Sequence, residues 1–265
     1  MRRRRGTVER HAAGIANLFA QHGLASPTRT FEHKKLIDRL RRLEQRPTKK
    51  ARPLLGVALD DLLLSYDTST LRGARDAAIA ALGGNRGPRS ATIVSIRIEH
   101  VSFPDRGVKI GLRDQKTSRS RDLEYMAEPH RRNHFACTPC AMQHYFSLLG
   151  SLSEGPFFRA IDRWGNVSNR PMTPKSISYI LRKNLARAGN PEADSYSSHS
   201  FRHGVVTTAA RKHWPIEEMM LVTMHRSKRS LLEYVQCIDP WYDAPARSVL
   251  DEKLTEDDAE RGWIH

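Results

Sequence analysis

The carboxyl-terminal third of the chain contains the stretch SHSFRHGVVTTAARKHWPIEEMMLVTMHRSKRSLLEYVQ, residues 198–236. It places His199 and Arg202 three residues apart at a predicted helix start, so both side chains leave one helix face. His225 opens a second turn and helix, and Tyr234 follows nine residues later on an amphipathic run. A tyrosine hydroxyl with histidine and arginine partners is suited to forming a covalent bond with a phosphate. The stretch therefore predicts a nucleophile and its charged neighbours.

The remainder of the chain is long and strongly basic. Its 265 residues are enough for one large domain or two smaller ones, and we predict two. The net charge of +15 and the pI of about 10.2 favour a polyanionic partner. No apolar run approaches the roughly 20 residues of a membrane span, and the arginines of residues 2–5 precede no signal-peptide core. Nucleic acid is thus the expected partner, and a membrane is not.

The charge is unevenly distributed along the chain. Residues 1–60 contain 15 Lys/Arg and 5 Asp/Glu, whereas residues 239–265 contain 3 and 8, which gives net charges of +10 and −5. An acidic tail is expected to dock on a basic protein surface and not on DNA. Three cysteines, an odd number in a chain of this length, indicate a reducing compartment without a disulfide framework. We therefore expect a cytoplasmic, nucleoid-associated protein.

The helical pattern changes near residue 47. Residues 7–45 have two amphipathic runs separated by a break from Gly23 to Pro27. Pro47 to Pro53 is basic and bracketed by prolines, which is typical of a linker. We predict a small helical domain over 1–46, a linker over 47–53, a second domain over 54–238 and an acidic tail over 239–265.

The second domain is predicted to be mainly α-helical with one small antiparallel sheet. Helices are expected over 57–64 and 70–82, with the second ending at Gly83-Gly84, and a short helix between Arg89 and Ile96. Alternating apolar residues predict short strands. The predicted strands are 98–103, 108–112 and 121–126, and the later predicted helices are 136–149, 174–188, 201–213, 216–223 and 230–237.

In these motifs the chain resembles the tyrosine recombinases, the phage-integrase family of site-specific DNA recombinases. The family's HxxR motif is present as residues 199–202, its second histidine as His225 and its nucleophile as Tyr234. Residues 71–78 resemble the helix that opens the family's catalytic domain, and 87–97 match the segment carrying its first catalytic arginine, which is Arg89 here. The resemblance covers residues 7–240, with an acidic residue of the pattern replaced by Thr92 and a common glycine by Met224.

The resemblance also implies roles for individual residues. The family's catalytic lysine lies on a hairpin, which corresponds to Lys116 between the predicted strands. Lys116 would protonate the leaving 5′ oxygen, His199 would act as acid or base, and His225 would hydrogen-bond the scissile phosphate. The implied catalytic set is Tyr234, Arg89, Lys116, His199, Arg202 and His225. The first 46 residues resemble the second half of the family's DNA-clamping core-binding domain, and the first half is missing from this sequence.

Other basic residues are expected to contact the phosphates of double-stranded DNA without choosing a sequence. These are Arg2, Arg3, Arg4, Arg5, Lys49, Lys50, Arg52, Arg119, Arg226 and Lys228. A different chemistry is available to His130, His134, Cys137 and Cys140, whose spacing could hold zinc. We favour a cysteine-proline turn at a helix start there, and expect no metal and no cofactor.

The implied reaction is breakage and rejoining of DNA through a 3′-phosphotyrosyl link, for integration, excision or resolution, by a tetramer on DNA. Two alternatives remain open. One is relaxation of supercoils in the manner of a type IB topoisomerase, and the other is a DNA-binding protein with a decayed active site.

Overall fold

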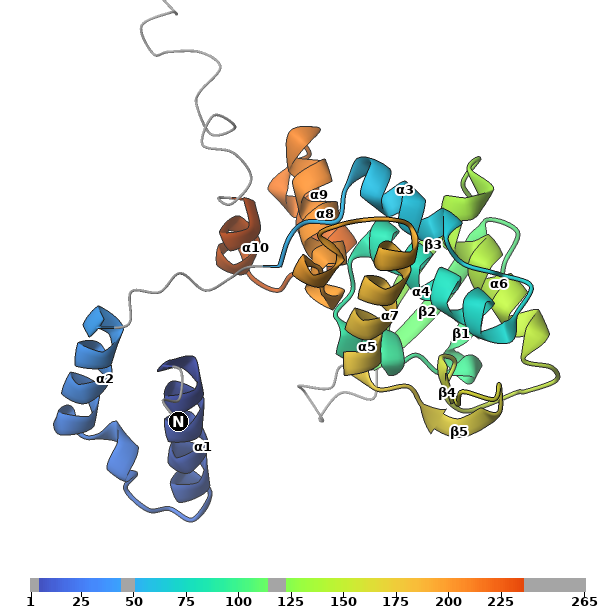
Figure 1. Cartoon of the computed structure of the whole chain (residues 1–265). Helices are drawn as coiled ribbons and strands as arrows, with labels where there is room; N and C mark the ends of the chain where they lie inside the picture. The colour runs from blue at the N-terminus through green and yellow to red at the C-terminus, as the bar shows by residue number, and fades with distance from the viewer. Residues whose placement is uncertain (1–4, 44–50, 114–122, 236–265) are drawn as a thin grey trace, which may run out of the picture. The chain divides into compact units, whose positions relative to one another are not determined.

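The computed structural model describes residues 5–43, 51–113 and 123–235, and it divides the chain into two units, Met1–Lys50 and Ala51–His265 (Figure 1). The division between the two units, after Lys50, falls within the predicted linker, 47–53. The predicted acidic tail lies outside the described residues. Because the two units are separate bodies, each is described by itself.

The first unit is a pair of helices, α1 (Arg5–Gln21) and α2 (Phe31–Leu43), joined through a 3₁₀ turn, η1 (Pro27–Arg29). The Thr28 hydroxyl donates to the Ala12 carbonyl at 2.8 Å, which ties the turn back to α1. Ala16 and Ile37 are buried, whereas several larger apolar side chains of both helices are exposed. Such a small core supplies little stability on its own.

The second unit is built around α4 (Leu71–Arg86), which packs on α3 (Gly56–Leu64), α6 (Thr138–Leu148), α7 (Pro174–Arg187) and α8 (Ser198–Arg211). Figure 1 shows α4 in the interior of this unit. Half of its buried positions are alanine, including Ala78 and Ala80, so neighbouring helices approach closely. This packing accounts for the short apolar side chains of the segment.

The predicted end of this helix at Gly83-Gly84 is wrong. The helix continues to Arg86 and ends at Gly87, which has the left-handed conformation with φ 58°. A Cβ on Gly83 would lie 2.7 Å from the ring of Phe201 on α8, and one on Gly84 would lie 3.1 Å from Leu59. These glycines allow helices to meet and do not end the helix.

The sheet is antiparallel, in the order β1 (Val101–Ser102), β2 (Gly107–Arg113), β3 (Leu123–Pro129), and it packs against α6. The predicted strand over 98–103 is mostly wrong, because residues 98–100 form a 3₁₀ turn, η2 (Ile98–His100), before β1. Sequence analysis also missed a hairpin of β4 (Arg159–Ile161) and β5 (Val167–Pro171). Its turn depends on Asp162, whose Oδ1 accepts from the backbone nitrogens of Trp164 and Asn166 at 2.9 Å each.

The remaining helices agree in type with the prediction. They are α5 (Ser90–Val94), α9 (Ile216–Thr223) and α10 (Lys228–Val235), with 3₁₀ turns η3 (His134–Ala136) and η4 (Ala193–Ser195). The predicted fold, mainly helical with a small antiparallel sheet, is thus confirmed. Within the described ranges, no helix combines the length and the apolar character needed to cross a membrane.

Residues 51–54 belong to the second unit and run against α8. The Leu54 backbone nitrogen donates to the Ser200 carbonyl at 3.0 Å, and the Leu54 side chain is 2 % exposed. Arg52 forms an ion pair with Glu192, and a Cβ on Gly204 would overlap the Leu54 carbonyl oxygen. This segment is therefore held on the helix that carries His199 and Arg202.

Candidate active site

Helix α8 begins three residues before its predicted start because Ser197 caps it. The Ser197 hydroxyl accepts from the His199 backbone nitrogen at 3.3 Å, and the Ser197 nitrogen donates to the Ser200 hydroxyl at 2.9 Å. The Ser200 backbone nitrogen also donates to the Ser197 side chain, so Ser197 and Ser200 form a reciprocal capping box. It places His199 in the first turn and Arg202 one turn further along on the same face.

Arg202 is almost fully buried, with 2 % of its surface exposed. Its Nη1 donates to the Gly87 carbonyl at 3.0 Å, and its Nε donates to His225 Nε2 at 3.1 Å. Its Nη2 is buried and makes no hydrogen bond within the described part of the chain. A buried guanidinium donor without a partner costs free energy, so this atom points to an anionic ligand.

His225 is also buried and is bonded on both nitrogens. The Thr223 hydroxyl donates to the Met219 carbonyl at 2.6 Å and lies 2.5 Å from His225 Nδ1. Because that hydroxyl proton is used, Nδ1 carries a proton and Nε2 accepts from Arg202. Thr223, which sequence analysis missed, thereby fixes the tautomer. The only sequence signal for it is a hydroxyl residue two positions before the histidine.

Met224 follows α9 in the left-handed conformation, with φ 54° and ψ 47°. Glycine adopts this conformation without steric cost, which gives a physical reason for the glycine of the family pattern at this position. The His225 backbone nitrogen donates to the Met220 carbonyl at 2.9 Å and closes the helix end. The turn thus directs the His225 side chain back toward Arg202.

Tyr234 lies near the end of α10, which packs on α8. Leu231 of α10 is buried against Val206 and Met219, and Tyr234 is half-buried beside this cluster. The Tyr234 ring centroid is 5.4 Å from that of His225 and 4.4 Å from that of His203. The predicted nucleophile and the predicted second histidine are therefore neighbours.

Arg89 joins the group from a different part of the chain, at the residue before α5. It lines a cavity of about 300 Å³ together with Arg202, Thr223, Met224 and Arg226. Its positive charge acts on His199, Arg202 and His225 alike. The structure thus brings together five of the six predicted catalytic residues. The sixth, Lys116, lies outside the described residues.

The electrostatics of this group favour a bound anion. Burial lowers the pKa of Arg202 to about 10, Arg89 lowers it further, and Tyr234 acts in the opposite direction. Burial also lowers the pKa of His225 to about 4, with Arg202 and Arg89 contributing. The same causes lower the pKa of His199. Both histidines are therefore neutral at pH 7, and a negative charge would offset the repulsion between the two arginines.

The structure describes the side chains of only three of the predicted DNA-contacting residues. Lys228 forms an ion pair with Glu217 at 2.7 Å, and Arg226 lies at the cavity that contains Arg89. Arg52 is paired with Glu192 on the second unit. The side chains of the others lie outside the described residues, namely Arg2, Arg3, Arg4, Arg5, Lys49, Lys50 and Arg119.

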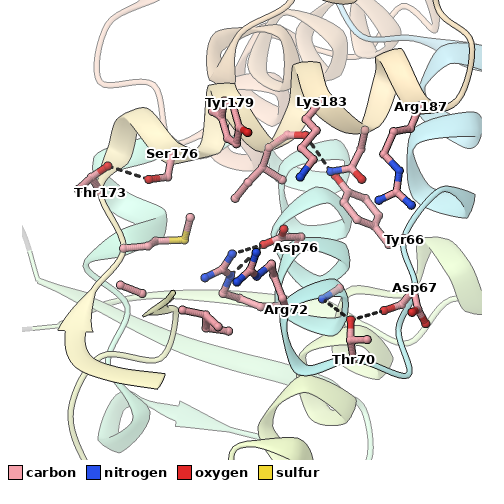
Figure 2. Close-up of a pocket in the computed structure, with 17 residues that line it drawn as sticks. Tyr66, Asp67, Thr70, Arg72, Asp76, Thr173, Ser176, Tyr179, Lys183 and Arg187 are labelled. Atoms are coloured by element: carbon pink, nitrogen blue, oxygen red, sulfur yellow. Dashed lines mark hydrogen bonds and ion pairs between the residues drawn. The ribbon is translucent and has the colours of Figure 1, made fainter. Parts of the chain in front are cut away.

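A second cavity, of about 400 Å³, lies between α4, α7 and the β4–β5 hairpin (Figure 2). Arg75 and Asp76 form a buried ion pair at its wall, at 2.7 Å, and Arg75 also donates to the Arg159 carbonyl. Burial raises the pKa of Asp76, and Arg75 opposes this. None of the predicted catalytic residues lines this cavity. The hydrogen bond from Arg75 on α4 to the Arg159 carbonyl on β4 holds the helix to the hairpin.

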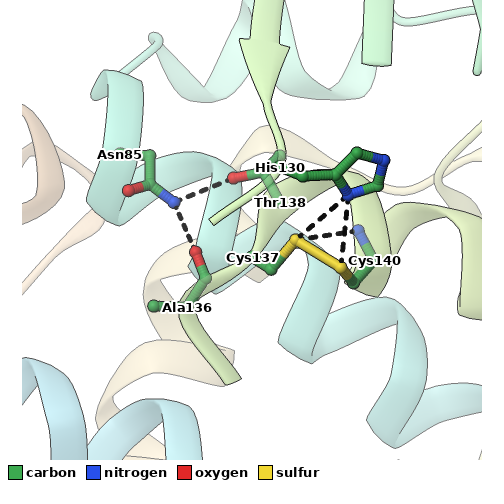
Figure 3. Close-up of a disulfide and its surroundings, with 6 residues drawn as sticks. All are labelled: Asn85, His130, Ala136, Cys137, Thr138 and Cys140. Atoms are coloured by element: carbon green, nitrogen blue, oxygen red, sulfur yellow. Dashed lines mark hydrogen bonds between the residues drawn. A yellow bond between two sulfur atoms is a disulfide. The ribbon is translucent and has the colours of Figure 1, made fainter. Parts of the chain in front are cut away.

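The four predicted zinc-ligand candidates are only partly brought together. Ligand atoms of His130, Cys137 and Cys140 lie within 4.8 Å of one another (Figure 3). His134 is not in this group. Cys137 and Cys140 are joined as a disulfide at the start of α6, where the expected cysteine-proline turn is found. This bond differs from the expectation of cysteines without a disulfide framework, and it links two residues only three positions apart.

Comparisons with known proteins agree with this architecture. No family model matches the sequence. An integrase/recombinase described as a XerD homolog, from Selenomonas ruminantium, is 28% identical over 184 residues, which is 69% of this chain and 53% of the relative. The chain therefore spans about half the length of this curated relative.

Solved structures show the same fold. XerA recombinase matches with a TM-score of 0.54 and 16% identity, over 87% of this chain and 77% of that chain. XerH site-specific recombinase, bound to a palindromic difH substrate in a post-cleavage complex, matches with a TM-score of 0.54 and 14% identity, over 71% of this chain and 50% of that chain.

The fold is that of solved site-specific recombinases, and the clustered arginine, histidine and tyrosine side chains agree with the resemblance to the tyrosine recombinases. The resemblance predicted from the motifs is confirmed, and this class consists of recombinases and integrases, which are enzymes. Among them, the integrase/recombinase of Selenomonas ruminantium is a relative in sequence, and XerA and XerH recombinases are relatives in fold.

Proposed function

We propose that this protein breaks and rejoins double-stranded DNA at specific sites through a covalent link between Tyr234 and a 3′ phosphate. The observation that carries the proposal is the buried guanidinium of Arg202, whose Nη2 has no partner in normal hydrogen-bond geometry among the described residues and which interacts with Tyr234 and Arg89. Two guanidinium groups are well suited to the oxygens of a phosphodiester. Tyr234 is then placed to attack the phosphorus.

In the proposed step, the Tyr234 oxygen forms a bond to phosphorus and the bond from phosphorus to the 5′ oxygen breaks. The tyrosine loses a proton and the 5′ oxygen gains one. The lowered pKa of His199 keeps its imidazole neutral at pH 7, and a neutral imidazole has a free lone pair that can accept the proton. Lys116 is proposed to protonate the 5′ oxygen. The phosphotyrosyl link retains the energy of the original bond, so attack by a partner strand's 5′ hydroxyl rejoins DNA without a nucleotide cofactor.

The proposed substrate is duplex DNA, and the net charge of +15 supports it. XerH, with the same fold, was captured on its difH substrate. The salt-bridged Lys228 and Arg52 would exchange their carboxylate partners for phosphates on binding. We propose further that two such sites are held by a tetramer, in which the acidic segment 239–265 docks on a neighbouring subunit, and that the protein acts in the cytoplasm at the nucleoid.

The decisive experiment is the capture of covalent adducts. A pool of nicked duplexes with randomised half-sites is incubated with the full-length chain, and protein-linked DNA is recovered after denaturation and sequenced. The wild-type chain should retain a defined subset of sequences, whereas Tyr234→Phe should retain none. Tyr179→Phe, at an exposed tyrosine of α7, is the matched control and should behave as wild type.

Each result discriminates between functions. Duplex binding without any wild-type adduct would support a DNA-binding protein with a decayed site and would refute the proposal. Adduct formation in Tyr234→Phe would show that the nucleophile is misassigned. Relaxation of a supercoiled plasmid that lacks the recovered sequence would instead support a type IB topoisomerase activity.

A further inference from the structure

The proposed DNA chemistry does not use the cluster of His130, Cys137 and Cys140. His130 follows β3, Cys137 caps the first turn of α6, and Cys140 lies within that turn (Figure 3). The His130 Nδ1 atom is 3.7 Å from Cys137 Sγ and 3.6 Å from Cys140 Sγ. One imidazole nitrogen is thus nearly equidistant from two sulfurs.

These two nitrogen–sulfur separations match those between ligands on one metal ion, whereas the two sulfurs are bonded to each other and must separate on reduction. With Zn–S near 2.3 Å and Zn–N near 2.05 Å in a tetrahedron, a sulfur and a nitrogen ligand lie about 3.5 Å apart. Thiolate and imidazole together are the donors that zinc prefers, whereas the exposed carboxylates typical of magnesium or calcium sites are missing from this group.

The backbone segments that carry the three side chains are held in place without a metal. The Asn85 side-chain nitrogen donates to the Ala136 carbonyl at 2.8 Å and to the Thr138 hydroxyl at 2.9 Å, which fixes the start of α6 on α4. On the other side, the His130 backbone nitrogen donates to the Arg106 carbonyl at 3.2 Å. The segment bearing the donors is therefore preorganised, which lowers the entropic cost of binding an ion.

The local electrostatics also favour a thiolate. Cys137 Sγ accepts from the Cys140 backbone nitrogen at 3.4 Å at the start of α6, where the helix dipole stabilises negative charge. Cys137 is fully buried, Cys140 is half-buried and His130 is exposed. An ion between them would therefore have one side open to water, which can supply the fourth ligand.

We propose that the reduced protein binds one Zn²⁺ ion through His130 Nδ1 and the sulfurs of Cys137 and Cys140, clipping the end of β3 to the start of α6. A small-molecule thiol or dithiol first reduces the disulfide to two thiols and is itself oxidised to a disulfide. Zinc then displaces both thiol protons and forms two Zn–S bonds and one Zn–N bond. The site is independent of the DNA chemistry proposed above.

The test measures metal content on the full-length chain, purified with a phosphine reductant and saturated with Zn²⁺ before gel filtration. Elemental analysis should find one zinc per wild-type chain, and His130→Ala and Cys140→Ser should each lose it. His134→Ala, at a histidine four residues from His130, and Cys237→Ser, at the remaining cysteine, are the matched controls and should keep it. Circular dichroism checks that all variants fold.

Two further measurements follow the ligands directly. Co²⁺ in place of zinc should give the visible absorption of a tetrahedral site with a thiolate charge-transfer band, which His130→Ala should weaken. A chelator should lower the Tm of the wild-type protein by roughly 3 °C or more and leave that of Cys140→Ser unchanged. Zinc retention in His130→Ala, or a disulfide that persists under reductant with no bound zinc, would overturn the proposal.

Discussion

The guanidinium of Arg202 is the residue on which the candidate active site depends most. Its fork holds the Gly87 carbonyl and His225 at once, while Nη2 remains for a ligand. Lysine keeps the charge but offers a single ammonium on a flexible stem, so it cannot reproduce this geometry. Arg202→Lys should therefore reduce the single-turnover rate of adduct formation by about 10² or more. A rate within a few-fold of wild type would contradict this role.

The neutral state of His225 predicts a pH dependence of stability. An unfolded histidine has a pKa near 6.5, and burial lowers the pKa of folded His225 to about 4. Between these values the unfolded chain binds a proton that the folded chain does not, so stability is complete above pH 6.5 and falls as the pH falls toward 4.

Chemical denaturation at pH 7.5, 6.5 and 5.5 measures this effect. His225→Gln removes the titrating ring, so its free energy of unfolding should fall less steeply over the same range. His199, whose pKa is also lowered, contributes equally to both proteins and cancels in the comparison. Equal slopes for the two proteins would show that His225 is not held in its neutral form.

At the scale of helices, the contact between α4 and α8 is sensitive to a single methyl group. Gly83→Ala would place a Cβ 2.7 Å from the Phe201 ring, against a rigid aromatic side chain. Gly84→Ala meets only the far end of the Leu59 side chain at 3.1 Å, which can rotate away. We expect Gly83→Ala to lower the free energy of unfolding by about 1–3 kcal/mol, and Gly84→Ala to have the smaller effect in the same denaturation assay.

These glycines also show where sequence analysis succeeds and fails. Amphipathic periodicity predicts α9 with its observed bounds, because that segment is patterned locally. The end of α4 is predicted too early, since a glycine required by a distant aromatic ring has the same local appearance as a glycine that ends a helix. The β4–β5 hairpin is missed because its strands are short, β4 has only three residues and β5 is mostly exposed, so neither shows a periodic apolar pattern.

In the candidate site, too, locally patterned residues are predicted and residues that depend on distant contacts are missed. Its principal side chains are predicted from the order and spacing of motifs, and the structure brings Arg89, Arg202, His225 and Tyr234 together. Thr223 and the Gly87 carbonyl are missed, because a tautomer-fixing hydroxyl and a backbone acceptor depend on three-dimensional contacts alone. Similarly, only the fold shows that His130, and not His134, approaches the cysteine pair.

At the scale of the whole molecule, the acidic segment 239–265 is predicted to act between subunits. Its charge of −5 opposes the charge of the remaining chain, and it contains the apolar residues Trp241, Val249 and Leu250. Deleting it should weaken the pairing of two DNA sites more than binding to one site. Native gels with one-site and two-site duplexes measure both, and unchanged pairing would exclude the docking role.

The attachment of residues 51–54 to α8 has a mechanical consequence. A pull on the chain at Ala51 is transmitted through the backbone bond from Leu54 to Ser200, which lies between His199 and Arg202 in sequence. A displacement of residues 51–54 would therefore act directly on the first turn of α8, which carries His199 and Arg202.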